Sequence, residues 1–325
     1  MTEVYFSKDI DKIIDKINIS KLGEKVAIKL HFGEKGCDTY LNPEIARKVH
    51  EAIVSTGRKA SLVDCNVLYK GSRTTREEHI ETAKTHGFGF ADINILDGEK
   101  GEEFIEVDDC KFGKGIEEYD SFIILSHFKG HPMTGFGGGL KNIGMGFASR
   151  AGKLDLHCNV KPSISSRCIG CGVCIDSCNA KAISIVKGKA KINQNLCEGC
   201  AMCIAVCPNE AISIPWKSKS AEELQSGIVK YSLAFLKRFP KTIFINVLEN
   251  ITEDCDCFGK KQESVIEDIG ILYSDDILSI EKASLELANK QGFEEKVHKN
   301  INKDKQIELA EKAKLGDKDY KIIYL

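Results

Sequence analysis

The chain has 325 residues, of which 42% are hydrophobic and 29% are charged, and its formal net charge is −2 at pH 7. This composition is typical of a globular protein with a full-sized core, built as two domains or as one domain with an insertion. A net charge near zero argues against a nucleic-acid binder, because phosphate binding requires a basic surface.

Short apolar runs alternate with amphipathic stretches in the first half of the chain. Asn42 followed by Pro43 is typical of a helix start, and Thr75 with Glu78 forms a capping box for a second helix. Strands are predicted around these helices at 26–30, 60–64, 93–96 and 121–125. Alternation of this kind predicts an α/β fold, with a mostly parallel sheet and helices packed on it.

The middle of the chain holds two copies of one cysteine pattern, C-x2-C-x2-C-x3-C. The first copy consists of Cys168, Cys171, Cys174 and Cys178, and the second of Cys197, Cys200, Cys203 and Cys207. This is the spacing of two-cluster bacterial ferredoxins, in which the fourth cysteine of each run ligates the other cluster. Zinc sites usually combine two C-x2-C pairs rather than repeated four-cysteine runs.

The pattern therefore predicts two 4Fe–4S clusters with shared ligation. We expect the first cluster to be held by Cys168, Cys171, Cys174 and Cys207. We expect the second cluster to be held by Cys197, Cys200, Cys203 and Cys178. Each run is followed by the sequence AISI, which is a strand in ferredoxins.

The α/β pattern resumes after the cysteine runs. A capping box of Ser220 and Glu223 begins a helix, and further helices are expected around Ala283 and Ile307. Strands are predicted at 242–248, 269–273 and 320–325. The simplest organisation is one α/β domain formed by residues 1–163 and 216–325, interrupted by a two-cluster, ferredoxin-like α+β insert at 164–215.

Polar side chains follow five of the predicted strands. Ligands of open α/β sheets bind beyond the carboxyl ends of the strands, so these positions predict one shared active edge. They are 31–33, 64–66, 126–129, 249–257 and 274–276.

The segment 126–153 is rich in glycine and lysine. Glycines let backbone amides approach a ligand and lysines supply positive charge, so this segment is a candidate cradle for an anionic cofactor or substrate. Its candidate binding residues are Gly135, Gly137, Gly138, Gly139, Lys141 and Asn142. The alternative is a tight, close-packed loop with surface lysines.

Histidines and cysteines outside the two runs are candidates for a third metal site. Cys255 and Cys257, together with His127 and His131, are residue types that bind zinc or iron. More commonly, such residues are buried and unreactive. A flavin is a second candidate cofactor for this edge of the sheet. Buried thiols are also expected at Cys37, Cys65, Cys110 and Cys158.

Several segments are specific enough to suggest a family. They are IKLHFGEKG (28–36), DCNVLYKGSR (64–73), LSHFKGHPMTGFGGGLKNIGMG (125–146), the two cysteine runs, CDC (255–257) and DIGILYS (268–274). With these, the chain resembles the iron–sulfur proteins of the "domain of unknown function 362" family. The resemblance implies an α/β domain with a ferredoxin module, and it implies no reaction. The chain departs from the family at Cys65, where threonine is expected, and at Glu281, where an aspartate is expected nearby.

Three functions are compatible with these patterns. The first is an iron–sulfur oxidoreductase whose clusters relay single electrons to a site on the α/β domain, where Lys141 or His127 donates a proton or binds an anionic small molecule. The second is an electron carrier that docks on a soluble redox partner without substrate chemistry. The third is a binding or regulatory protein with structural clusters.

The surroundings of the protein are also predicted from the sequence. Fourteen cysteines without a recognisable secretory signal predict a reducing cytoplasm, and the clusters suggest a host that lives with little oxygen. No stretch approaches the ~18 apolar residues of a membrane span, so no membrane attachment is expected.

Overall fold

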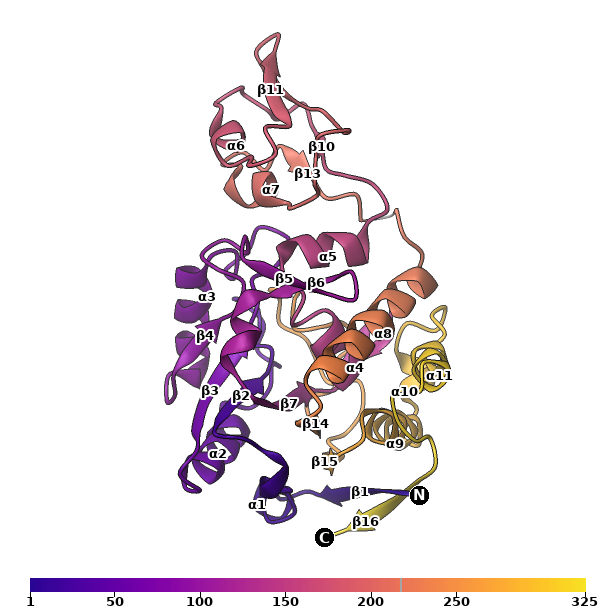
Figure 1. Ribbon diagram of the computed structural model, residues 1–325. Coiled ribbons are helices and arrows are strands. Elements are labelled where there is room, and N and C mark those ends of the chain that lie inside the picture. Colours follow the sequence, from indigo (N-terminus) through magenta and orange to yellow (C-terminus); the bar gives the residue numbers. More distant parts are fainter. Residues whose placement is uncertain (217) are drawn as a thin grey trace.

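The computed structural model of the protein describes residues 1–216 and 218–325. Eight strands make up its central sheet: β1 (Thr2–Ser7), β2 (Lys25–Lys29), β3 (Lys59–Asp64), β4 (Ile93–Ile95), β7 (Ser121–His127), β14 (Thr242–Leu248), β15 (Gly270–Ser274) and β16 (Tyr320–Tyr324). Their order is β16-β1-β15-β14-β7-β2-β3-β4 (Figure 1). The prediction of an α/β fold with a mostly parallel sheet is confirmed.

One strand of this sheet runs against the others. Strands β14, β7, β2, β3 and β4 pair in parallel, and so do β1 and β16, whereas β15 is antiparallel to both β14 and β1. The carboxyl end of β15 therefore lies at the opposite edge of the sheet. The prediction that residues 274–276 belong to the shared active edge is wrong. Asp276 instead caps a helix at that opposite edge by accepting a hydrogen bond from the Ser279 amide at 2.8 Å.

Helices cover both faces of the sheet (Figure 1). On one face lie α1 (Ile10–Ile14), α2 (Pro43–Val54) and α3 (Arg76–Ala83), and on the other lie α4 (Gly139–Gly144), α8 (Ala221–Arg238), α9 (Ile277–Asn289), α10 (Phe293–Lys296) and α11 (Asp304–Lys312). Two predicted caps are present: Asn42 accepts from the Glu44 amide at 3.0 Å, and Ser220 forms a capping box with Glu223. Thr75 accepts from the Glu78 amide at 3.3 Å, but the Glu78 carboxylate accepts from the Thr75 hydroxyl and not from its amide, so this box is half formed.

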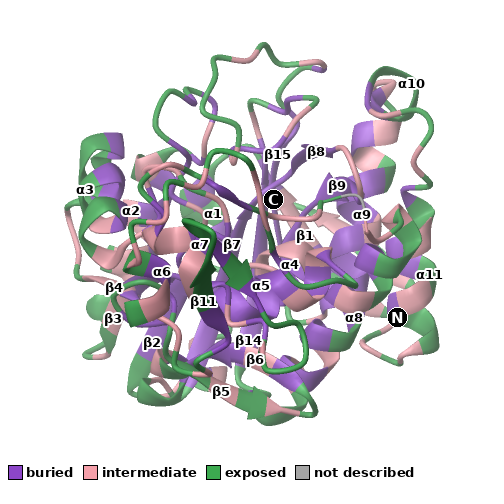
Figure 2. Ribbon diagram, turned by 90° about the horizontal axis from the view of Figure 1, so that it is seen from above, coloured by how far each residue is buried: buried purple, intermediate pink, exposed green. Residues whose placement is uncertain are grey.

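The hydrophobic core has two layers, one on each side of the sheet. Successive side chains of a strand point to opposite faces, and every residue of β7 and β14 is buried (Figure 2). Ile123 of β7 packs toward α2, whereas Phe122 packs against Phe235 of α8 with ring centroids 5.0 Å apart. Burial on both faces explains why these strands read as continuous apolar runs.

Residues 163–214 form a small unit, here called the module, which stands apart from the sheet above α5 (Arg150–His157) (Figure 1). Its elements are β10 (Ser163–Ile164), α6 (Val173–Asp176), β11 (Ile183–Val186), β12 (Lys189–Ile192), α7 (Met202–Val206) and β13 (Ile212–Ser213). Strand β10 pairs with β13, and β11 pairs with β12, in two separate two-stranded sheets. Both AISI segments contain strands, as predicted.

The module packs on the domain through a few side chains. Leu154 of α5 and Leu68, from the loop after β3, belong to the same buried cluster as Ile204 and Ile212 of the module. Arg150, at the start of α5, is fully buried and donates to the carbonyls of Leu68, Thr74 and Lys100 at 3.2, 2.6 and 2.6 Å. The start of α5, the helix below the module, is therefore tied to two loops of the domain.

Several short elements were not predicted from the sequence. They are the hairpins β5 (Phe104–Val107) with β6 (Cys110–Gly113) and β8 (Lys129–His131) with β9 (Gly135–Gly137), together with the turns of helix Ile19–Lys21, Lys84–Phe88 and Lys114–Glu118.

In the part of the chain that the structure describes, no helix combines the length and the apolarity needed to cross a bilayer.

Candidate functional site

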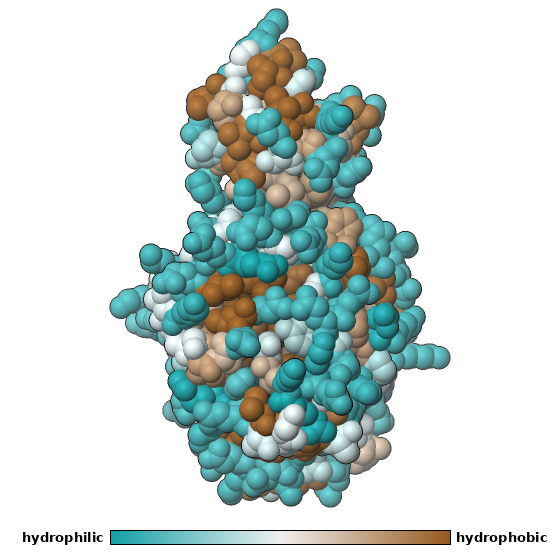
Figure 3. All heavy atoms as spheres, turned by 60° about the vertical axis from the view of Figure 1, so that its left-hand side comes forward, coloured by the Kyte–Doolittle hydropathy of each residue, from teal (hydrophilic) through white to brown (hydrophobic). Residues whose placement is uncertain are grey.

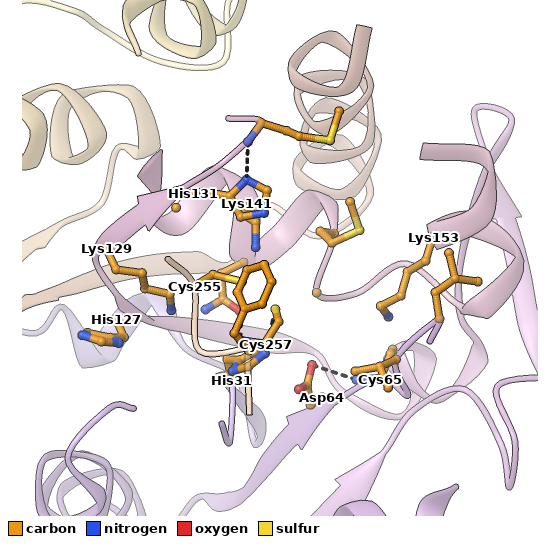
Figure 4. A pocket seen from close by; sticks show the side chains of 18 of the residues that line it. His31, Asp64, Cys65, His127, Lys129, His131, Lys141, Lys153, Cys255 and Cys257 are labelled. Atoms are coloured by element: carbon orange, nitrogen blue, oxygen red, sulfur yellow. Dashed lines mark hydrogen bonds between the residues drawn. The ribbon is translucent and has the colours of Figure 1, made fainter. Parts of the chain in front are cut away.

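A cavity of about 550 Å³ opens at the carboxyl edge of the parallel strands, below the module. Four strands bring polar side chains to it: His31 follows β2, Asp64 ends β3, Lys129 follows β7, and Cys255 and Cys257 follow β14 (Figure 4). The structure thus brings together four of the five positions predicted for a shared edge. Apolar side chains complete the wall, namely Val67, Leu68, Met133, Met145, Trp216 and Phe258.

The floor of the cavity is a buried ion pair. The Lys29 ammonium lies 3.0 Å from the Asp64 carboxylate and donates to the Asn142 side-chain oxygen at 2.7 Å. Burial lowers the pKa of Lys29. Burial alone would raise the pKa of Asp64, but the Lys29 charge and a hydrogen bond with His79 hold it well below its ordinary value. Asn142 also donates to the carbonyls of Lys29 and Leu125, so it joins β2 to β7 rather than facing a ligand alone.

A second buried ion pair stands beside the first. Arg73 is 3.2 Å from Glu34 and donates to the Tyr69 hydroxyl at 2.9 Å, and that hydroxyl donates to the Cys257 carbonyl at 3.1 Å. Burial alone would lower the pKa of Arg73, but the neighbouring Tyr69 and Glu34 charges raise it. This network fixes the loop after β14 against the loop after β3.

Asp256 is the third buried carboxylate of the site and has two basic partners. Its oxygens accept from His127 Nδ1 at 3.0 Å and from the Lys129 ammonium at 2.6 Å. The other nitrogen of His127 contacts the Glu249 carbonyl at 2.8 Å. Both acceptors lack a hydrogen, so both ring nitrogens face acceptors of the protein. His127 was predicted as a proton donor, and both of its ring nitrogens are engaged within the protein.

Lys141 projects from α4 into the cavity, and no hydrogen bond or ion pair of its ammonium occurs within residues 1–216 and 218–325. Burial alone would lower the pKa of Lys141, but the charges of Cys255 and Cys257 raise it above its ordinary value. The nearby histidines are neutral by contrast. Burial and the Lys141 charge lower the pKa of His131 well below its ordinary range and that of His157 to about 4. Within the described residues, the Lys141 ammonium is therefore available to a ligand, whereas the Lys153 ammonium, at the same cavity, donates to the Ala148 carbonyl.

Cys257 and His31 face one another across the cavity edge. His31 Nδ1 accepts from the Gly33 amide at 3.1 Å, and His31 Nε2 lies 3.5 Å from the Cys257 sulfur. Contact with the Cys255 side chain and the hydrogen bond with His31 hold the pKa of Cys257 well below its ordinary value. Contact with Cys257 and burial raise the pKa of Cys255. Cys257 is therefore the more acidic of the two thiols.

The glycine-rich segment is mostly close-packed. The amides of Gly139 and Leu140, which open α4, donate to the Glu281 carboxylate at 2.7 and 3.2 Å, so the protein supplies its own anion there. A Cβ atom at Gly144 would lie 2.5 Å from the Ile228 carbonyl of α8. Among the predicted binding residues, Gly137, Gly138, Lys141 and Asn142 line the cavity. Gly135 packs against Lys303 instead.

The cysteines of the two runs gather inside the module. Cys168, Cys171, Cys174 and Cys207 line one small cavity together. Their assignment to one cluster stays a prediction. Cys178, Cys197 and Cys203 of the second set pack against the buried cluster that contains Cys174 and Cys207 of the first. Burial comes first among the causes that raise the pKa of the Cys203 thiol to about 12.

The third metal site stays a prediction. Within the described residues, no three or more His, Cys, Asp or Glu side chains are arranged to hold a single metal ion. His127 is engaged with Asp256, and His131 Nδ1 accepts from the amides of Met133 and Thr134. The structure instead brings His31 to Cys257.

Some residues of the site could not be found by pattern alone. Lys29 lies inside a predicted strand, where a lysine next to buried apolar residues is the only signal of the ion pair with Asp64. The pairing of His31 with Cys257 joins residues 226 positions apart, which no local motif links. Arg73 stood within a family-like segment, yet its partner Glu34 was not foreseen.

Fold and site together define an α/β protein with a cavity at the carboxyl edge of a mostly parallel sheet and with a small cysteine-rich module above it. The family described as "Domain of unknown function (DUF362)" matches residues 26–286. The chain belongs to this family. The comparison with curated proteins gives no match.

Two solved structures show distant similarity. The lactate racemase apoprotein of Thermoanaerobacterium thermosaccharolyticum aligns with 13% identity and a TM-score of 0.35, over 76% of this chain and 50% of that one. A crystal structure of a Thermotoga maritima protein from a structural genomics consortium aligns with 12% identity and a TM-score of 0.41, over 91% of this chain and 60% of that one. The chain thus spans half to three fifths of their lengths, and neither likeness bears on its function.

Proposed function

We propose that the chain is an iron–sulfur redox protein in which the two cysteine sets hold two 4Fe–4S clusters and the cavity of the α/β domain receives an anionic small molecule for reduction or oxidation. Paired clusters of this type supply single electrons at low potential. The proposal combines the repeated cysteine spacing with the arrangement of the module and the cavity.

The residues of the module suit such clusters. The four cysteines of the first set surround a common cavity, and each thiolate of a cube binds a different iron, so they need not meet at one point as around a single ion. Backbone amides of Ala190 and Ala211 donate to the sulfurs of Cys168 and Cys207 at 3.3 and 3.2 Å. Amide donors of this kind stabilise thiolate ligands and tune the potential of a cluster.

One observation carries the proposal: the cavity and the module share a wall. Leu68 lines the cavity and also packs in the buried cluster that contains Cys174 and Cys207. His157, at the end of α5, and Trp216, just after the module, line the cavity as well, with their rings 5.0 Å apart. Electron tunnelling falls steeply with distance, so a wall shared with the module supports electron exchange between a ligand in this cavity and the module.

Lys141 is the residue that binds the ligand in this proposal. Its ammonium has no internal partner in the described chain, whereas the ammonium groups of Lys29 and Lys129 are paired with Asp64 and Asp256. An anionic group would therefore dock on Lys141, and the apolar wall from Met133 to Trp216 would enclose the rest of the molecule. The neutral His131 beside it is available for hydrogen bonding or proton transfer.

A simple electron carrier is the second candidate. Apolar side chains gather on the surface of the module (Figure 3), and Ile169 and Leu196 are 68% and 54% exposed. Such a surface suits a soluble redox partner. The carrier function leaves a large cavity with an unpartnered lysine unexplained, so it ranks second.

The test begins with a cofactor inventory of anaerobically purified protein. We expect about eight irons and about eight acid-labile sulfides per chain, and reversible bleaching of their absorbance by dithionite. Failure to bind iron and sulfide, even after anaerobic reconstitution, would contradict the clusters.

The cavity is tested by ligand binding. Thermal shifts are compared for the wild type, Lys141→Met and the surface control Lys237→Met, with phosphate, benzoate and flavin mononucleotide as probes. We expect at least one anion to stabilise the wild type and Lys237→Met but not Lys141→Met, with cluster absorbance unchanged in all three proteins. Intact clusters with no anion dependence on Lys141 would favour the electron carrier.

A further inference from the structure

The loop after β14 places two thiols side by side at the cavity edge. Asp256, between them, is clamped by His127 and Lys129, so the backbone of Cys255 and Cys257 is held firmly. The Cys257 amide donates to the Cys255 sulfur at 3.4 Å, so the Cys255 side chain is folded back toward Cys257. Two cysteines this close in the chain can be joined by a disulfide when their side chains turn toward each other.

The two sulfurs have different surroundings. Cys255 is buried, whereas Cys257 is partly exposed and both line the cavity. Because the Gly33 amide donates to His31 Nδ1, the neutral imidazole carries its hydrogen on Nε2, which points to the Cys257 sulfur at 3.5 Å. The Cys257 sulfur is therefore a hydrogen-bond acceptor, as a thiolate is.

A third group supports the same assignment. Figure 4 shows Lys141 directed toward the loop that carries Cys255 and Cys257. A nearby ammonium stabilises a thiolate and attracts substrates that carry negative charge. The remaining cavity thiol differs: Cys65 is buried and donates to the Phe147 carbonyl at 3.5 Å, so its hydrogen is already engaged.

We propose that Cys255 and Cys257 form a redox-active dithiol, with Cys257 as the nucleophile, that exchanges with small anionic disulfides entering the cavity. A cavity volume of about 550 Å³ favours a small molecule over a protein disulfide. Lys141 binds the anionic group of the substrate, and His31 keeps the Cys257 sulfur reactive.

The exchange is balanced in two steps. The Cys257 thiolate attacks one sulfur of the substrate, the substrate S–S bond breaks, and the departing thiolate takes a proton from solvent. Cys255 then attacks the Cys257 sulfur of this mixed disulfide, and its proton passes to the second departing sulfur. One disulfide enters, two thiols leave, and the two electrons come from the protein dithiol, which becomes the Cys255–Cys257 disulfide.

The experiment uses anaerobic holoprotein and oxidised glutathione as the probe. After an acid quench, free thiols are alkylated, and the tryptic peptide 242–260, which contains both cysteines, is analysed by mass spectrometry. We expect an internal disulfide in the wild type and in the control Cys65→Ser. Cys255→Ser should retain glutathione on Cys257, and Cys257→Ser should react at least about tenfold more slowly.

The role of His31 is tested separately through the pH dependence of Cys257 alkylation by iodoacetamide. His31→Gln should move the midpoint of that profile to higher pH, an effect that a merely structural role would not produce. Two free, fully alkylated thiols after treatment with glutathione disulfide would overturn the proposal. So would zinc or iron that is lost from Cys255→Ser and Cys257→Ser, because it would make these residues metal ligands.

The proposal stands independently of the clusters. Iron and sulfide content reports on the module, whereas the disulfide of peptide 242–260 reports on this pair alone. Either result can therefore fail without the other.

Discussion

The α/β domain and the module are stabilised in different ways. The domain has helices of up to 18 residues and central strands of seven, with apolar side chains buried on both faces of the sheet. In the module, helices have four or five residues and strands two to four. Cysteines take the place of apolar side chains in its buried cluster, where Cys174 and Cys207 lie beside Ile204.

This difference teaches where the stability of each part originates. A two-layer core of the size seen in the domain stabilises a fold by burial of apolar surface alone. A unit of about 50 residues with so little regular structure normally depends on metal centres or disulfides. The comparison therefore predicts that the domain folds without iron and that the module does not.

The largest expected effect is the collapse of the module when a cluster ligand is lost. Cys174→Ser should remove about half of the iron and sulfide or more, because the first predicted set loses one of its thiolates. Limited proteolysis, read by mass spectrometry, should then cut within 163–214 while the domain stays resistant.

The matched control is Cys158→Ser, since Cys158 is buried in the same cluster but belongs to neither run. This variant should keep its iron and its resistance to protease. A Cys174→Ser protein with full iron content and an uncut module would show that the module is stabilised without clusters.

A large-to-small substitution in the core of the domain should have the opposite effect, with lower stability of the domain and unchanged iron content. Phe235 is fully buried and packs on Phe147 with ring centroids 4.5 Å apart. Phe235→Ala should lower the free energy of unfolding of the domain by about 3–5 kcal/mol in a urea titration. The iron content should not change, and Phe104→Ala, at a partly exposed strand position, should cost less than about 1 kcal/mol. Loss of iron in Phe235→Ala would mean that the two parts fold as one unit.

A smaller effect is expected from pH. Burial raises the pKa of Asp97 to about 6, although the Lys153 charge opposes it. The ordinary value is about 3.9, so the protonated folded form contributes stability below about pH 4, and this is lost as the pH rises through about 6. The loss should be about 1–3 kcal/mol in urea titrations across this range. Asp97→Asn should remove this pH dependence, and an unchanged pH profile in the variant would contradict the assignment.

Much of the fold was predictable because its signals are local. The Asn42 cap, the Ser220–Glu223 capping box and the continuous apolar runs of β7 and β14 each lie within a few residues. Strand direction has no local signal, so the reversal of β15 could not be foreseen. Strand β1 was missed because it is only partly buried and its sequence lacks a continuous apolar run.

The candidate site was predictable only as a region. The carboxyl ends of the strands carry the polar residues, and that rule located His31, Asp64 and Cys257. Their partners depend on tertiary contacts: Glu281, 142 residues from Gly139, occupies the amides that were expected to bind a ligand. A glycine-rich segment indicates that its backbone packs closely against another group, but it does not indicate whether that group is a ligand or the protein itself.

The buried guanidinium of Arg150 has a mechanical consequence. It fastens the start of α5 to the carbonyls of Leu68, Thr74 and Lys100, while the far end of the same helix supplies His157 to the cavity and leads into the module. Helix α5 therefore links the anchored loops of the domain directly to the module. A protein that docks on the module would act on a unit that is joined at both of its ends to residues of the cavity wall, His157 before it and Trp216 after it.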